Sequence, residues 1–312
     1  MPVMAATAFA PATVGNVGVG FDILGHAFGV IGDRVRASRS VEPGIRIRGV
    51  TGIAGALPLE PERNTAGQAV LSLVQAASPA FGIELTIEKG IPLGSGLGGS
   101  AASAVAAVVA ANALLDAPLA ATGLLPHAIA GEAVASGARH ADNIAPALFG
   151  GLVLTVGIDH PRVKQIPVPP AVRCVLLRPH MYLATQQARG ILTRSVDLSD
   201  VVWQTANLAG FLAGCYTNDL ALIREAFEDV LIEPQRAQLI PGFRHAKRAA
   251  IAAGALGCSI SGAGPSVFAW SEEGRAEGVR EAMLLAFRSE GVDCDHWIAP
   301  IGGDGARIVE RR

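Results

Sequence analysis

The first half of the chain alternates short apolar runs with turn residues. Residues 83–91, IELTIEKGI, show the clearest strand pattern, because apolar and β-branched positions alternate with Glu84, Thr86 and Glu88. Upstream, residues 7–30 read as a strand, a loop rich in Gly and Asn, and a second apolar element. Directly after the 83–91 strand comes a glycine-rich loop and then an alanine- and valine-rich run, which we expect to be a helix.

The middle of the chain contains a helix, a strand and then a stretch without clear periodicity. Residues 124–137 have helical character, and residues 151–156, GLVLTV, read as a strand. Residues 159–170, DHPRVKQIPVPP, are rich in proline and polar residues and show little helical or strand periodicity. We interpret this stretch as a domain boundary, with an N-terminal domain of residues 1–160 and a C-terminal domain of residues 161–312.

The second half mixes strands and helices without a regular repeat. In chain order we expect a strand at 172–179, two amphipathic helices within 200–227, a helix at 242–254, two strands joined by a glycine turn within 255–270, a helix at 275–291 and a last strand within 305–310. Because strands and helices do not alternate as regular βαβ units, the sequence predicts an α+β fold.

Composition favours a protein that buries a large core and binds a small molecule. The chain has 312 residues, enough for about two domains, and 50% of them are hydrophobic against 17% charged. Its 25 basic and 27 acidic residues form no basic block, which argues against a nucleic-acid surface.

Two further features indicate a reduced, cytoplasmic protein. The cysteines stand far apart, so we expect reduced packing residues and neither a disulfide framework nor a zinc site; they are Cys174, Cys215, Cys258 and Cys294. The N-terminus has no charged segment followed by an apolar core, and the apolar run 101–115 is too short and too rich in small residues to span a membrane.

The glycine-rich loop before the predicted helix is the main candidate for chemistry. A flexible loop before a core helix would explain it, and so would a helix N-terminus left open for an anion. A Walker A motif needs a lysine where Ser100 stands. The GxGxxG pattern of a dinucleotide-binding (Rossmann) site is present at Gly94, Gly96 and Gly99. Such a site also needs an acidic residue at the end of a second strand to bind the ribose. Asp116 stands at about the right distance but is not at the end of a strand. A GxSxG nucleophile turn fails further along, because Ser261 takes its last glycine position.

The remaining interpretation is a loop that holds phosphate through its backbone N–H groups. Ser100, at the start of the helix, could bind a phosphate oxygen or Mg²⁺. Since Mg²⁺ prefers carboxylates together with phosphate oxygens, an acidic partner is expected elsewhere. Glu132 is the candidate, as an isolated acid in an apolar helical segment; an ordinary solvent-facing glutamate would also explain it.

Three motifs resemble those of the GHMP kinases, the family of galacto-, homoserine, mevalonate and phosphomevalonate kinases. PLGSGLGGSAAS (92–103) is similar to the family's phosphate loop, APATVGNVGVGFDILG (10–25) to its N-terminal motif and SISGAGPSVFA (259–269) to its C-terminal glycine motif. The resemblance implies a two-domain fold: an α+β N-terminal domain with a left-handed βαβ unit, and a ferredoxin-like C-terminal domain.

Within the family, NVGVGFDILG, RHADNIAPALFGGL and GARIVE look most like the homoserine kinase branch, and the first motif lacks the basic residue usual in mevalonate and galactose kinases. The implied reaction moves the γ-phosphoryl of ATP to the hydroxyl of L-homoserine, giving O-phospho-L-homoserine on the route to threonine. The branch also implies Mg²⁺ and a homodimer. Another small-molecule kinase of the family, or an inactive nucleotide- or metabolite-binding homologue, is the alternative.

The resemblance also assigns residues to roles. For ATP it implies Asn64, Lys89, Pro92, Leu93, Gly94, Ser95, Gly96, Leu97, Gly98, Gly99 and Ser100, and for Mg²⁺ it implies Ser100 and Glu132. For the substrate it implies Asn16, Asp22, His140, Asn143, Arg189 and Arg236, of which Asp22 and Asn143 are the catalytic candidates.

Each assignment has a plainer competitor. Asp22 and Asn64 could be helix caps, His140 a structural histidine, and the two arginines ordinary surface residues. The sequence also departs from the family pattern: Gly99 replaces the first of two usual serines, and TVGNVGVG (13–20) replaces the commoner TSANLGPG. Gly99 removes one hydroxyl near the phosphates but keeps its backbone N–H.

Overall fold

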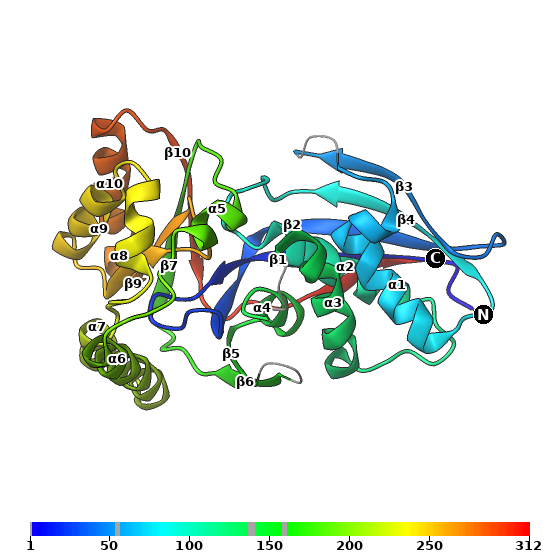
Figure 1. Ribbon diagram of the computed structural model, residues 1–312, viewed down its shortest axis with the longest axis horizontal. Helices are drawn as coiled ribbons and strands as arrows, with labels where there is room; N and C mark the ends of the chain where they lie inside the picture. Colours follow the sequence, from blue (N-terminus) through cyan, green and yellow to red (C-terminus); the bar gives the residue numbers. More distant parts are fainter. Residues whose placement is uncertain (1, 54–56, 137–140, 158–160) are drawn as a thin grey trace.

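The computed structural model describes residues 2–53, 57–136, 141–157 and 161–312, and within them it contains two sheets (Figure 1). The first sheet has seven strands, in the order β11-β1-β2-β4-β3, with β5 paired to β2 and β6 paired to β5. Its strands are β1 (Ala5–Gly15), β2 (Leu24–Ser40), β3 (Ile45–Gly52), β4 (Gly82–Lys89), β5 (Leu152–Val156), β6 (Arg162–Ile166) and β11 (Arg307–Arg311).

Helices cover this sheet and form the first unit with it. Strands β3 and β4 are parallel and are joined through α1, which makes the βαβ unit that the family resemblance implies. The helical segments are η1 (Pro61–Arg63), α1 (Thr65–Ala77), α2 (Gly99–Asn112), α3 (Ala121–Ser136) and α4 (Ile144–Phe149).

The second unit has a four-stranded sheet in the order β10-β7-β9-β8, with all neighbouring strands antiparallel. The chain order, one strand, a helical stretch, two strands, one helix and a last strand, is the ferredoxin-like β-α-β-β-α-β arrangement. Its elements are β7 (Val172–Pro179), α5 (Thr185–Gly190), α6 (Leu198–Thr217), α7 (Leu220–Glu225), α8 (Glu233–Arg236), η2 (Ala237–Leu239), α9 (Phe243–Ala252), β8 (Gly257–Ile260), β9 (Val267–Glu272), α10 (Glu273–Ser289) and β10 (Cys294–Pro300). The predicted α+β fold class is therefore confirmed.

One sequence-based expectation is wrong. The pattern of residues 159–170 predicts little strand character, but Arg162–Ile166 forms β6 and pairs with β5. Within the part of the chain the structure describes, β6 has one neighbouring strand, and its Arg162, Lys164 and Gln165 side chains are exposed, so the apolar alternation of a half-buried strand is missing. The first sheet also takes β6 and β11 from the part of the chain after residue 160. The domain boundary at residue 160 therefore stays a proposal.

Helix α2 lies in the centre of the first unit. Most of its residues are buried, and it packs against α1, α3 and strands β1 and β2. A helix buried on nearly every side needs no polar stripe, and small side chains let its neighbours approach closely. This packing explains the run of alanines and valines and fixes the position of the helix N-terminus.

The two units meet through a buried aromatic cluster. Trp270 of β9 packs against Phe211 and Phe227, with ring centroids 5.1 and 5.6 Å away, and lies 6.0 Å from the ring of His26 in β2. The Nε1–H of Trp270 points at Nε2 of His26, 3.5 Å away. Burial lowers the pKa of His26 to about 4, so the ring is neutral at physiological pH and can accept this bond.

Among the described helices, none combines the length and apolar character that crossing a membrane requires. The four cysteines are all free, and three of them are buried, in line with the expected packing role.

Candidate active site

A cavity of about 420 Å³ opens where the phosphate loop faces α5 and α8 of the second unit. All nine loop residues from Pro92 to Ser100 line it. The remaining lining residues are Asn16, Asp22, Leu57, Glu132, Asp142, Asn143, Tyr182, Ala184, Thr185, Gln186, Arg189, Arg236, Gly262 and Ala263.

The glycines of the loop are required by its backbone. Gly94, Gly96 and Gly98 have φ values of 60°, 74° and 65°, in the left-handed region that favours glycine. A Cβ on Gly96 would lie 2.6 Å from the carbonyl oxygens of both Gly264 and Ser261. The glycines therefore allow a tight turn and a close approach by a second backbone segment.

The three motifs singled out in the sequence meet at this loop. Ser261, from the C-terminal glycine motif, donates its hydroxyl to the carbonyl of Gly96 at 2.7 Å. Thr13, from the N-terminal motif, donates its backbone N–H to Leu97 O at 3.0 Å. Segments far apart in the sequence thus hold the loop in one conformation.

The N-terminus of α2 opens into the cavity. Gly98 is the N-cap residue and offers no side chain to bond the first N–H groups of the helix. In a 14-residue helix these groups and the aligned peptide dipoles favour a negative charge at that end. A phosphate is the group that such a glycine loop and helix start accommodate.

Ser100 and Glu132 come together beside this helix start. The Ser100 hydroxyl donates to Glu132 Oε1 at 2.9 Å, from α2 to α3. Burial raises the pKa of Glu132 to about 7, although the Ser100 hydrogen bond and the Lys89 charge both lower it. Glu132 is therefore not a solvent-facing glutamate, and a carboxylate and a hydroxyl on one cavity wall fit the oxygen ligands that Mg²⁺ prefers.

Asp22 and Arg189 form a bidentate ion pair across the cavity. Nη1 and Nη2 of Arg189 donate to Oδ2 and Oδ1 of Asp22 at 3.0 and 2.9 Å. Asp22 has a left-handed φ of 61° and precedes strand β2, so the helix-cap interpretation is wrong. The neighbouring Asp22 carboxylate raises the pKa of Arg189.

Arg236 and Asn16 converge on one carbonyl group. Arg236 Nη1 and Asn16 Nδ2 both donate to the oxygen of Gly262, at 2.9 Å each, while Asn16 Oδ1 accepts from the Asp22 N–H. The guanidinium of Arg236 lies 5.2 Å from the centre of the Phe21 ring. It is 3% exposed, so it is not an ordinary surface arginine.

Asn143 lines the cavity at the start of α4 and has a buried acidic neighbour. Its Oδ1 accepts from the Thr13 hydroxyl at 2.7 Å, and its Nδ2 donates to Asp142 Oδ2 at 3.0 Å. Burial, followed by the charges of Asp22 and Glu132, raises the pKa of Asp142 to about 7.

Asp142 was not among the residues predicted from the sequence. A carboxylate beside Asn143, directly before the apolar stretch IAPALFG, was the available signal. The predicted substrate residue His140 lies outside the described residues. Tyr182, whose ring abuts the loop at Gly94, is a second lining residue that no sequence pattern selects.

Comparisons with known proteins place this arrangement in a family. Residues 64–151 match the family model for the GHMP kinases N terminal domain, and residues 211–288 match that for the GHMP kinases C terminal. A homoserine kinase of Xylella fastidiosa is 51% identical over 97% of this chain and 94% of its own. The chain belongs to the GHMP kinase family.

Other relatives agree on the branch and the fold. A homoserine kinase of Chloroherpeton thalassium is 42% identical, over 97% of this chain and 99% of its own. The crystal structure of homoserine kinase from Cytophaga hutchinsonii superposes with a TM-score of 0.94 at 42% identity, covering 98% of this chain and 97% of that one. A galactokinase from Lactococcus lactis, at 15% identity and a TM-score of 0.70, shares the fold.

Two residues expected at the nucleotide in this GHMP kinase are not among those that line the cavity. Asn64 caps α1, where its side chain accepts from the N–H groups of Ala66 and Gly67. This is the helix-cap role that the sequence offered as the alternative. Lys89 is 2% exposed and forms an ion pair with Asp33 beneath the loop. The structure gives both residues supporting roles and no direct contact with the cavity.

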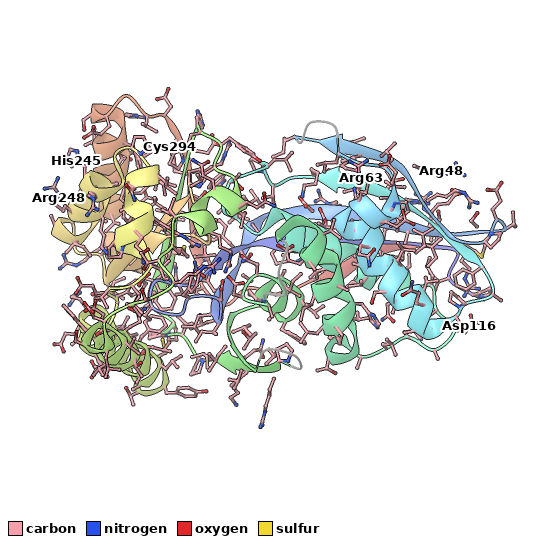
Figure 2. The ribbon with its side chains drawn as sticks, in the orientation of Figure 1. Arg48, Arg63, Asp116, His245, Arg248 and Cys294 are labelled. Atoms are coloured by element: carbon pink, nitrogen blue, oxygen red, sulfur yellow. The ribbon has the colours of Figure 1, made fainter. Side chains whose placement is uncertain are left out.

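The competing dinucleotide interpretation of the loop is also wrong. Asp116 lies beyond the far end of α2, at the outer edge of the first unit in Figure 2, where its side chain is 86% exposed and pairs with Arg39. It is followed by α3 and not by a strand. The acid that a dinucleotide site would use to bind the ribose therefore does not stand beside the glycines.

Proposed function

We propose that this GHMP kinase is an ATP-dependent homoserine kinase, which transfers the γ-phosphoryl of ATP to the hydroxyl of L-homoserine and so produces O-phospho-L-homoserine for threonine biosynthesis. One observation carries the proposal: a single cavity holds the phosphate loop and, facing it, two arginines and two aspartates suited to an amino acid. The homoserine kinases at 42% and 51% identity support the same activity.

On the nucleotide side, the loop supplies backbone donors in a fixed arrangement. The left-handed glycines let the loop line the cavity with its backbone, and the open start of α2 adds its dipole. Because phosphoryl transfer depends on positioning and on neutralising charge, donors that are already in place lower the barrier without further reorganisation.

Ser100 and Glu132 would hold Mg²⁺. Their oxygens lie 2.9 Å apart at the loop, and the buried Glu132 carboxylate gains most from a nearby cation. When bound, the ion supplies positive charge against the phosphates.

Glu132→Gln should cut turnover by several orders of magnitude and weaken Mg²⁺ binding in titrations with ADP, with Glu62→Gln on the exposed η1 as the control. Unchanged Mg²⁺ affinity would exclude Glu132 as a ligand.

On the acceptor side, each charged group of the amino acid has a counterpart. Arg236 has no hydrogen-bond partner for Nη2 among the described residues, and together with Arg189 it suits the carboxylate. Asp142 suits the ammonium group, whose charge would favour ionisation of this buried carboxyl. Asp22, held by the Arg189 fork, would accept a hydrogen bond from the attacking hydroxyl and orient it.

Release of ADP from ATP in the presence of L-homoserine, L-serine, mevalonate or galactose tests this function. We expect turnover with L-homoserine, and a kcat/KM for L-serine, one methylene shorter, that is lower by about 10- to 200-fold. Mevalonate lacks the ammonium group and galactose lacks both charges, so neither should support turnover. Preferred turnover of mevalonate or galactose would point to another branch of the family, and ADP binding without turnover of any acceptor to an inactive homologue.

The expected cytoplasmic location and homodimer stay predictions supported by the family resemblance. Light scattering of the purified chain at micromolar concentration measures the second directly: a mass near 64 kDa, twice the 32.0 kDa of the chain, is the expected result.

A further inference from the structure

A buried polar cluster lies directly beneath the phosphate loop and outside the cavity lining. It consists of Asp33 in β2, Lys89 at the end of β4 and Ser103 in α2, which are 0%, 2% and 4% exposed. Asp33 and Lys89 form an ion pair through Oδ2 and Nζ. Ser103 donates its hydroxyl to Asp33 Oδ2 at 2.6 Å and accepts from Lys89 Nζ at 2.9 Å.

Backbone groups at both ends of the loop bind to this cluster. At the entrance, Asp33 Oδ1 accepts from the N–H groups of Gly90 and Ile91 at 3.0 and 3.1 Å. At the exit, Lys89 Nζ donates to the carbonyl of Gly99, the first residue of α2, at 2.7 Å. One ion pair therefore fixes the distance between the point where the loop leaves β4 and the point where it enters the helix.

General energetics argue that this cluster does more than stabilise the fold. A buried ion pair gains little or nothing over well-packed apolar residues of similar volume, because both charges lose their hydration. What apolar residues cannot provide is directional bonding to two N–H groups and one carbonyl. Those bonds restrict the loop before a ligand arrives, and such preorganisation is what strengthens phosphate binding.

We propose that Asp33, Lys89 and Ser103 form a positioning cluster that presets the phosphate loop and the start of α2 for the nucleotide phosphates. The inference rests on the proposed function in that the loop is taken as the ATP site. None of the three residues is among those that line the cavity, so the cluster acts through the backbone that it holds.

Two variants separate positioning from stability. Lys89→Met keeps the aliphatic stem but leaves Asp33 as an unpaired buried charge, so we expect both a lower Tm and weaker ADP binding. In the double variant Asp33→Asn/Lys89→Met no charge is buried, and the side-chain amide oxygen introduced at position 33 can still accept from the N–H groups of Gly90 and Ile91. Its Tm should recover, but the bond to the Gly99 carbonyl remains absent.

The readouts are the Kd of ADP by calorimetry, the KM of L-homoserine at saturating ATP, and Tm. Loss of one charged hydrogen bond to the loop predicts a Kd of ADP raised about tenfold in both variants. The KM of L-homoserine should stay within about twofold, because the residues proposed to bind it lie across the cavity. The matched control is Arg39→Met/Asp116→Asn, which removes an ion pair bound to the carbonyl of Leu114, just beyond the other end of α2; its Kd of ADP should not change.

Recovery of ADP affinity together with Tm in the double variant would overturn the inference, as would parallel losses for ADP and L-homoserine or an equal loss in the control. Absence of ADP binding by the wild-type protein would instead overturn the proposed function, and the inference with it. A raised Kd of ADP at recovered Tm, with unchanged KM for L-homoserine, is the result that supports a positioning cluster.

Discussion

At the residue scale, Asp142 is a carboxyl group whose surroundings disfavour its charge. It is 5% exposed, and besides its burial the charges of Asp22 and Glu132 raise its pKa to about 7, from an ordinary value of 3.8. Between these two values the folded protein holds the proton more tightly than the unfolded chain does. The free energy of unfolding therefore falls as pH rises from about 4 to about 7, and this contribution is constant above that.

We predict that Asp142→Asn removes this pH dependence. The stability gained over wild type should be larger at pH 8 than at pH 5, by up to about 3 kcal/mol, since one pH unit corresponds to about 1.4 kcal/mol. Chemical denaturation of both proteins at the two pH values measures the difference, with the exposed Asp304→Asn as the control. Equal effects at pH 5 and pH 8 would show that Asp142 is ionised in the folded protein throughout this range.

Arg189 and Arg236 differ in their present partners, and this difference predicts different kinetics. Arg189 holds the Asp22 carboxylate with both of its terminal nitrogens, whereas Arg236 donates to the carbonyls of Ala188 and Gly262. Arg236→Lys should raise the KM of L-homoserine about 10-fold through the lost bidentate geometry, with little change in kcat. Arg189→Lys should lower kcat as well, because it also frees the orienting Asp22.

Steady-state kinetics with L-homoserine and with its methyl ester check both predictions. The ester lacks the carboxylate charge, so most of the KM penalty of Arg236→Lys should vanish with it, while the kcat penalty of Arg189→Lys should persist. Penalties of the same size on both substrates would mean that Arg236 does not bind the carboxylate.

At the element scale, the loop and α2 work as one phosphate-binding element, and its glycines are not equivalent. Gly96 has a positive φ and carbonyl oxygens 2.6 Å from the position of a Cβ. Gly99 opens α2 with ordinary helical geometry, and a Cβ there would lie 3.1 Å from Ile91 Cγ2, the end of a side chain. Of these two positions, Gly96 is closed to a side chain by backbone atoms, whereas at Gly99 the buried Ile91 side chain has to shift by only a few tenths of an ångström.

We therefore predict opposite outcomes for two substitutions three residues apart. Gly96→Ala should distort the loop and raise the KM of ATP more than about tenfold, because backbone strain and a close contact together exceed about 1.4 kcal/mol. Gly99→Ser, which introduces the serine common in the family, should leave the KM of ATP within about threefold. If both variants lose ATP binding equally, the close approach at Gly96 is not what the loop requires.

At the scale of the whole molecule, the C-terminal strand completes the N-terminal sheet. Strand β11 pairs antiparallel with β1, so the last residues of the chain lie beside the first strand and both termini sit at the same end of the first unit (Figure 1). Ile308 packs against the core, whereas Val309 is 48% exposed. The sheet that supports the cavity is therefore completed by residues that lie far along the chain from the phosphate loop.

Ile308→Asp should lower Tm by several degrees, because a charge would be forced against the core, whereas Val309→Asp on the solvent face should change it little. Differential scanning calorimetry distinguishes the two. A β11 that contributed nothing to stability would give the two variants the same Tm as wild type.

The sequence alone determined those features that depend on local pattern and local chemistry. The alternation in residues 83–91 predicted β4, and the alanine-rich run predicted α2, because side-chain periodicity reflects which face is buried. The three glycine motifs indicated the family and the loop, since phosphate binding by backbone N–H groups imposes residue types at fixed spacing. The sequence also selected Ser100 and Glu132 as joint Mg²⁺ ligands, and the family resemblance named Asp22 and Arg189 as substrate residues without indicating that these two would pair.

Only the tertiary structure decided what depends on which segments meet. It put Lys89 beneath the loop against Asp33, 56 residues away, and it left Asn64 as the cap of α1. It brought Asp142 into the cavity and gave β6 and β11 their places in the sheet. Local sequence patterns cannot predict these outcomes, because burial, ion pairing and strand pairing depend on residues that are distant in the sequence. Those residues become neighbours only when the chain has folded.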